Sequence, residues 1–184
     1  MSEGWHGWVF TFTGVVLTTV AVLPFAALAV WALARRRGST GRASLAEVGM
    51  VYGTVPWVWM TMLPGSGAGD VPGRVSLVPL QDLVTMGQTQ VIGNLLVFAA
   101  LGFFAPLRFA AVASVPRILA LAASCSVLIE TAQYVLWLDR VSSVDDVLLN
   151  AAGAGLAALA SRRWWRTAQC VRRVGLSSPP VDVA

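Results

Sequence analysis

The 184-residue sequence is poor in charge: 12% of its residues are acidic or basic, and every basic residue is Arg. A soluble domain usually carries about 25% charged residues. The chain has one histidine, His6, and two cysteines, Cys125 and Cys170, at no metal-ligand spacing. We therefore expect no metal site, no cofactor and no disulfide. No Ser-His-Asp set and no zinc-ligand spacing in the sequence supports a named reaction.

What the chain has in excess is hydrophobic residues, 57% of the total, gathered in long runs. A run of about 20 such residues is long enough to cross a bilayer. The sequence therefore predicts an all-α, polytopic membrane helix bundle in a single domain, residues 1–160. No cleavable signal peptide is expected, because the first run is long and ends in an Arg cluster. Five spans are predicted, at about residues 9–34, 45–63, 91–109, 118–138 and 144–160.

Two stretches lie between the second and third predicted spans. Residues 64–73 are rich in glycine and predict a flexible loop. The following stretch, 75–90, is apolar but short, and Pro79 and Asp82 interrupt it. We therefore expect 75–90 to be an interfacial or re-entrant piece and not a span.

The positions of the arginines predict the orientation. Alternate connections hold eleven Arg residues on one side of the membrane and two, Arg74 and Arg140, on the other. By the positive-inside rule the N-terminus lies outside and the C-terminus in the cytoplasm. Residues 161–184 form a basic cytoplasmic tail, partly disordered, that either lies on the inner leaflet or only anchors the last span. Because the arginines follow apolar runs, no nucleic-acid partner is expected.

Polar residues inside the last three spans are the candidate functional residues. A charged side chain at the bilayer centre costs about 2.5–3.5 kcal/mol, so such residues usually serve a function or a polar network. Glu130, Gln133, Tyr134 and Trp137 have the spacing of one helical face, as do Asp146, Asn150 and Gly153. Seven candidates are predicted to converge on the outer half of the bundle, where they would bind a ligand: Asn94, Glu130, Gln133, Arg140, Asp145, Asp146 and Asn150.

Three interpretations of this cluster stay open. In the first, the polar groups only hold the helices together. In the second, Arg140 binds a phosphate or carboxylate of a ligand while the acids and amides bind hydroxyls or amines. In the third, Glu130 or Asp146 is a catalytic general base and Arg140 stabilises developing negative charge. Asp145 and Asp146 are adjacent on a helix and point about 100° apart, so one site is not expected to use both.

The distance between Glu130 and Arg140 limits the catalytic interpretation. Ten positions correspond to roughly 15 Å along a helix. These two residues can share a site only if the intervening loop folds back over the bundle. Gln133 and Asn150 are the nearer candidates as partners of Glu130.

Three motifs carry a resemblance to the VanZ-like family of bacterial membrane proteins. They are GNLLVFAALGFFAPL (93–107), IETAQ (129–133) and RVSSVDDVLLNAAGAGL (140–156), and the similarity covers about residues 75–160. Two features depart from the family pattern. The segment at 76–80 is Ser-Leu-Val-Pro-Leu, and Ser143 stands where many relatives carry Asp.

The resemblance implies an integral protein of the bacterial cytoplasmic membrane with a role in the cell envelope. The family's founding role is low-level resistance to the glycopeptide antibiotic teicoplanin, without a defined biochemical activity. The implied partners are membrane lipids and either a lipid-linked envelope precursor or an amphiphilic antibiotic. A transferase or hydrolase acting on a lipid-linked substrate, and a purely structural protein, are the alternatives.

Overall fold

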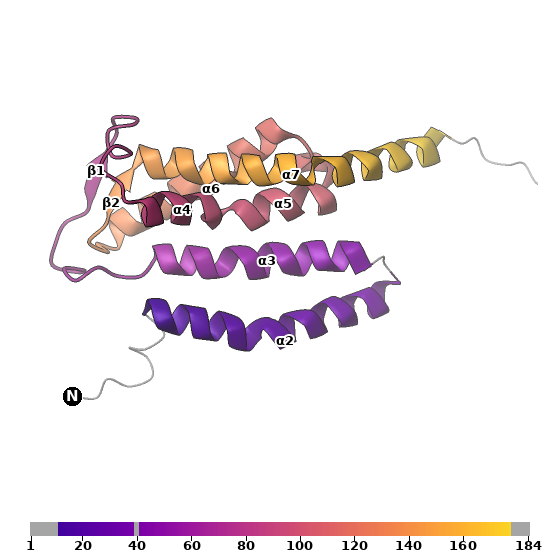
Figure 1. The fold of residues 1–184 in the computed structure, drawn as a ribbon, viewed down its shortest axis with the longest axis horizontal. Helices are drawn as coiled ribbons and strands as arrows, with labels where there is room; N and C mark the ends of the chain where they lie inside the picture. Colours follow the sequence, from indigo (N-terminus) through magenta and orange to yellow (C-terminus); the bar gives the residue numbers. More distant parts are fainter. Residues whose placement is uncertain (1–10, 39–40, 178–184) are drawn as a thin grey trace, which may run out of the picture.

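The computed structural model describes residues 11–38 and 41–177, and describes side chains as far as residue 167. The described chain is a bundle of long helices lying side by side, with two short strands at one end (Figure 1). The elements are α2 (Phe12–Arg37), α3 (Gly41–Thr61), β1 (Arg74–Ser76), α4 (Gln88–Val97), α5 (Ala99–Arg108), a 3-10 turn (Ala110–Val112), α6 (Val115–Val135), β2 (Val141–Ser143) and α7 (Val144–Ser177).

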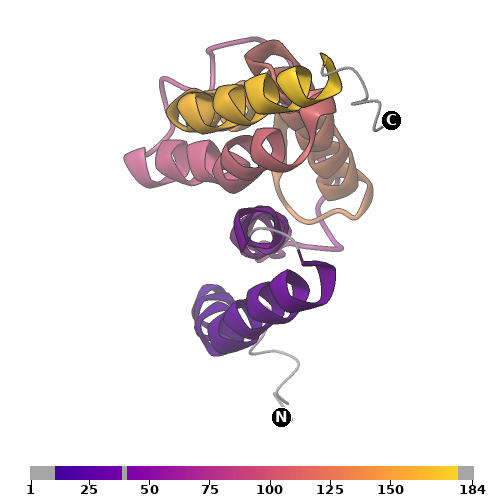
Figure 2. The same cartoon turned by 90° about the vertical axis from the view of Figure 1, so that its right-hand side faces the viewer.

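Four helical segments are long and apolar enough to cross a membrane: α2, α4 with α5, α6, and α7 as far as Thr167. They agree with the first, third, fourth and fifth predicted spans. The second predicted span forms α3, which has 21 residues but is not among these four segments. Figure 2 shows α3 between α2 and the remaining helices, so neighbouring helices cover two of its sides. A helix in that position needs less apolar surface than one that faces lipid all round.

Helix α7 is the centre of the bundle, because α4, α5 and α6 all pack against it. The shared core contains large side chains of α4 and α6 and small alanines of α7. Gly102 and Gly153 allow the closest approaches. A methyl group on Gly102 would overlap the carbonyl of Ala154, and one on Gly153 would overlap the carbonyl of Leu95. Glycine at these positions therefore lets α5 and α4 contact the backbone of α7.

Helix α2 is the outermost element and packs against α3 (Figure 2). Only 6% of its apolar window is buried, against 39% for α7. It begins at a capping Thr11, whose hydroxyl accepts the Gly14 N–H, and ends at Gly38, which has a left-handed φ of 53°. Pro24 lies inside it, and Figure 1 shows that the helix bends near its middle. Such an exposed apolar helix is typical of one that faces lipid.

The last helix is longer than expected. Helix α7 continues without a break through residue 160 to Ser177, so the predicted last span and the first part of the predicted tail are one helix. Figure 1 shows its C-terminal part extending beyond the other helices. The remaining tail residues, 178–184, lie outside the described residues, as does His6.

Candidate functional site

The connection between α6 and α7 turns back over the end of the bundle. It leaves α6 after Val135, and Trp137 and Asp139 both have left-handed φ angles, 50° and 53°. Residues 141–143 then form β2, which pairs in parallel with β1, Val75 opposite Ser142. This small sheet was not predicted, because each strand has only three residues. It buries Ser142 and Ser143 over the end of α6.

Glu130 is buried on α6 and is bound to this sheet. Its Oε2 accepts the N–H of Ser143 at 3.0 Å, and its backbone carbonyl accepts the hydroxyl of Ser142 at 2.8 Å. The expected partners, Gln133 and Asn150, are not the ones found. Instead, Gln133 donates from Nε2 to the carbonyl of Thr61, and Asn150 donates from Nδ2 to the hydroxyl of Ser126. The chain reversal after α6 brings the serines closer than either amide.

Asp145 is 2% exposed and holds the loop that follows β1. Its carboxylate accepts three backbone N–H groups, from Leu80 at 2.6 Å and from Asp82 and Leu83 at 2.9 Å each. Hydrogen bonds to a buried carboxylate offset the cost of its burial. Leu80 has a left-handed φ of 66°, a strained conformation that these bonds hold in place.

Ser143 links this loop to Glu130. Its hydroxyl donates to Asp82 at 2.5 Å and accepts the N–H of Asp145 at 3.1 Å. The hydroxyl of Ser143 and, second, that of Ser76 lower the pKa of Asp82, because both hydrogen-bond to its carboxylate. Ser142 and Ser143 were not among the predicted site residues. A Ser-Ser pair just before two acids was the only signal, and it gave no hint of the strand pairing.

Asp146 faces a different neighbour from Asp145, as their adjacent positions on a helix predict. It accepts a hydrogen bond from the Asn94 side chain of α4. Two of the predicted site residues, Asn94 of α4 and Asp146 of α7, are therefore in contact. Asp145 therefore binds the loop after β1, and Asp146 binds helix α4.

Arg140 lies close enough to act electrostatically on both Glu130 and Asp146. The loop therefore does fold back, which was the condition for Arg140 and Glu130 to share a site. The guanidinium of Arg140 donates to the carbonyl of Leu63, through Nη2 at 3.1 Å and Nε at 3.3 Å. The predicted common face of α6 ends before Trp137, however, because the helix stops at Val135.

A cavity of about 260 Å³ opens beside Glu130. Three of its lining residues are buried polar ones: Glu130, Ser142 and Ser143. The other lining residues come from β1, the segment after it, α6 and α7, and most are apolar: Val75, Leu77, Val127, Thr131, Tyr134, Val144 and Val147. The cavity thus has a polar base and an apolar wall. Among the side chains that the structure describes, those of residues 11–38 and 41–167, no three of His, Cys, Asp or Glu are placed to hold a metal ion.

The apolar helices and this buried polar cluster define the class, a helical membrane protein with a polar site at one end. A model of the VanZ/LLP1 family matches residues 50–166, which contain all seven predicted site residues. The chain therefore belongs to the VanZ/LLP1 family. Helix α2 lies outside the matched region. Comparisons with curated proteins and with solved structures found no match.

Proposed function

We propose that this protein lies in the cytoplasmic membrane of a bacterium and binds an amphiphilic component of the cell envelope at the end that carries Glu130. The observation that carries the proposal is the cavity beside Glu130, with its polar base and apolar wall. Pockets that bind small molecules are mostly apolar and have a few converging polar groups that fix orientation. A ligand with both a polar head and a hydrocarbon part matches such a lining.

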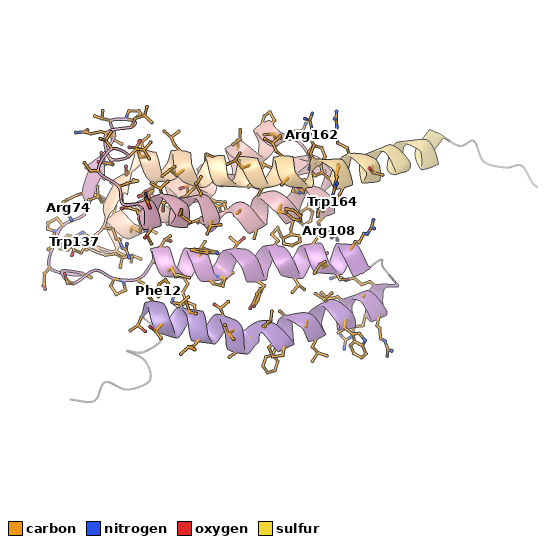
Figure 3. The ribbon with its side chains drawn as sticks, viewed as in Figure 1. Phe12, Arg74, Arg108, Trp137, Arg162 and Trp164 are labelled. Atoms are coloured by element: carbon orange, nitrogen blue, oxygen red, sulfur yellow. The ribbon has the colours of Figure 1, made fainter. Side chains whose placement is uncertain are left out.

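The distribution of arginine supports an outward-facing cavity. Figure 3 shows Arg108 and Arg162 at the end of the bundle opposite Arg74 and Trp137. By the positive-inside rule the arginine-rich end faces the cytoplasm. The cavity, which lies near the other end, then faces the outer leaflet, where envelope precursors and antibiotics are met. Binding of either kind of amphiphile there accounts for resistance of the teicoplanin type.

Resistance measured in cells tests this function. Cells that express the protein should tolerate more teicoplanin than cells without the gene. Glu130→Ala should remove that gain while membrane abundance stays normal, because the change deletes the polar base of the cavity. Leu128→Ala is the matched control, since Leu128 lies on the same helix, is exposed and does not line the cavity. Full resistance in Glu130→Ala would contradict the proposed function.

The same experiment separates binding from a purely structural role. Asn150 and Ser126 form a buried hydrogen bond between α7 and α6 that does not touch the cavity. Asn150→Ala should therefore lower abundance, whereas Glu130→Ala should not. If both variants lose abundance equally, the polar residues only hold the helices together.

A carboxylate at the base of a cavity also favours a second function, catalysis on a lipid-linked substrate by a transferase or hydrolase. Glu130 would be the general base. Comparing envelope lipids and peptidoglycan precursors with and without the gene tests this function. A new or depleted species that reverts with Glu130→Gln supports an enzyme, and unchanged envelope composition opposes it.

A further inference from the structure

The mouth of the cavity lies along the side of α6. Val127, Thr131 and Tyr134 line the cavity at helical spacing, and Val127 and Tyr134 are 51% and 44% exposed. Across the mouth, Val75 and Leu77 are 54% and 72% exposed. Glu130 is 9% exposed. Because α6 is one of the four segments that are long and apolar enough to cross a membrane, an opening on its side would face lipid and not the aqueous phase.

The segment beside the mouth is unusually apolar for an exposed loop. Leu77, Val78, Leu80 and Val84 are all exposed, with Val84 at 86%. Contiguous exposed apolar groups mark a membrane or protein contact. Three hydrogen bonds to Asp145 fix the loop in this arrangement. The segment is therefore held with its apolar side chains outward, as an interfacial piece requires.

The base of the cavity is acidic and accepts hydrogen bonds. No arginine lines the cavity. The two arginines at this end of the described chain have partners: Arg140 donates to the carbonyl of Leu63, and Arg74 lies 3.6 Å from Asp139. An anionic head would meet the Glu130 carboxylate inside the cavity, whereas Arg140, which acts on Glu130 electrostatically, does not line the cavity. A primary ammonium, which is cationic and has three N–H donors, complements the carboxylate and the hydroxyls around it.

Building on the proposed function, we infer that the cavity takes an amphiphile with a primary ammonium head, which enters sideways from the outer leaflet between α6 and the segment after β1. The ammonium group binds Glu130, and the hydrocarbon chain stays in the bilayer beside Val127 and Leu77. The ligand never crosses water on this route. The inference thus adds the chemical class of the ligand and its path to the site.

Photo-crosslinking in nanodiscs tests this inference without reference to resistance. The purified full chain is placed in phosphatidylcholine nanodiscs that contain a small fraction of a lipid with a diazirine in its acyl chain. The probe lipid is phosphatidylethanolamine, compared with phosphatidylglycerol and phosphatidylcholine carrying the same chain. Mass spectrometry maps the labelled residues.

We expect phosphatidylethanolamine to label Leu77, Val127 and Val147 about tenfold more than the other two probes, the ratio that a hydrogen bond to a charged group supplies. Glu130→Gln should abolish this preference without changing the size of the cavity. Equal labelling by the three lipids, or stronger labelling by phosphatidylglycerol, would overturn the inference. Labelling confined to surfaces away from the cavity would overturn it too.

A pair of tryptophan variants tests whether the selective labelling arises in the cavity. Val147→Trp fills the cavity and should remove selective labelling, whereas Leu128→Trp adds the same bulk to the exposed surface of α6 and should not. Selective labelling that persists in a folded Val147→Trp protein contradicts binding in the cavity. If labelling behaves as expected but the gene gives no resistance, the site is confirmed and the proposed resistance function fails. If resistance depends on Glu130 but labelling is unselective, the proposed resistance function stands and the inference of an ammonium ligand fails.

Discussion

The two ends of the bundle carry opposite charge and use it in different ways. One end, which we call the acidic end, holds six acids and two arginines of the described chain. The other, the basic end, holds one acid, Glu47, and nine arginines with described side chains, among them Arg108 and Arg162 in Figure 3. The acidic end lies at the sheet and the basic end at the start of α3 and α6 (Figure 1).

Contacts at the acidic end join segments far apart in the chain. Asp145 binds a loop more than 60 residues away, and Asn94 binds Asp146 across 52 positions. At the basic end, the aromatic contacts of arginine are local: Arg35 stacks on Trp31, and Arg163 on Trp164. Glu47 is the exception, since it binds Arg37 of α2 at 2.6 Å and Arg108 of α5 at 2.5 Å.

This difference indicates that the acidic end depends on particular side chains and the basic end mainly on total charge. A buried carboxylate with several donors loses all of them when it is removed. An exposed arginine at a helix end keeps its guanidinium in water, so few contacts are lost when it is removed. The other arginines at the same end still set the orientation of the protein in the membrane. Removing a buried carboxylate that accepts several backbone N–H groups, as Asp145 does, should therefore be costly, whereas removing an exposed arginine at the basic end should cost little.

The largest effect should come from Asp145→Ala. The change leaves three N–H groups of the 80–83 loop without their acceptor, and we expect a loss of about 3 kcal/mol or more in the free energy of unfolding. Thermal unfolding in detergent measures the loss, and limited proteolysis should show new cleavage near Leu80. Asp70→Ala, at an exposed position of the same end, is the control and should be neutral. A stable Asp145→Ala protein would contradict the importance we assign to this residue.

An intermediate effect should come from Glu47→Gln at the basic end. Loss of the charge weakens the contacts that join α3 to both α2 and α5, so the melting temperature should fall, but less than in Asp145→Ala. Arg163→Gln is the matched comparison, because the Arg163 guanidinium stacks on the neighbouring Trp164 of the same helix, and it should change stability by less than about 0.5 kcal/mol. Equal effects of these two variants on the melting temperature would contradict the claim that Glu47 contributes more to stability than the exposed arginines at the basic end.

The smallest effect should be a pH dependence from Asp82. Its pKa in the folded protein lies below the ordinary value because Ser143 and Ser76 hydrogen-bond to the carboxylate. The ionised form therefore stabilises the fold above about pH 4, and this contribution is lost as the pH falls through the folded pKa. Melting temperatures of the wild type and Asp82→Asn should differ at pH 6, and the difference should shrink as the pH is lowered below about 4. A difference that does not change with pH would contradict the assignment.

Much of the helical fold could be predicted from the sequence, because long apolar runs and helix-ending residues are local signals. The ends of α2, α6 and the α4–α5 segment lie within a few residues of the expected ones. The continuation of α7 past residue 160 was missed, since a polar, basic composition was taken to end the span. The periodicity of hydrophobic residues indicates which face of a helix is apolar, but it does not indicate where a polar, basic helix ends.

Of the seven predicted site residues, Glu130 lines the cavity, and the contacts that the others make could be predicted only in part. Asn94 and Asp146 were both named, and the structure places them in contact. The partners of Glu130 were not foreseen, because they depend on a parallel pairing between segments 67 positions apart. Two left-handed residues after α6 produce that pairing, and neither is glycine. Such a turn has no clear sequence signature, so Ser142 and Ser143 could not be placed from spacing alone.

Cysteine labelling in intact cells tests most directly that the acidic end faces away from the cytoplasm. In a background without Cys125 and Cys170, single cysteines replace Asp70 at the acidic end and Arg163 at the basic end. We predict that a membrane-impermeant maleimide labels the residue-70 variant in intact cells and the residue-163 variant only after the cells are opened. The opposite pattern would place the Glu130 cavity on the cytoplasmic side and contradict the proposed function.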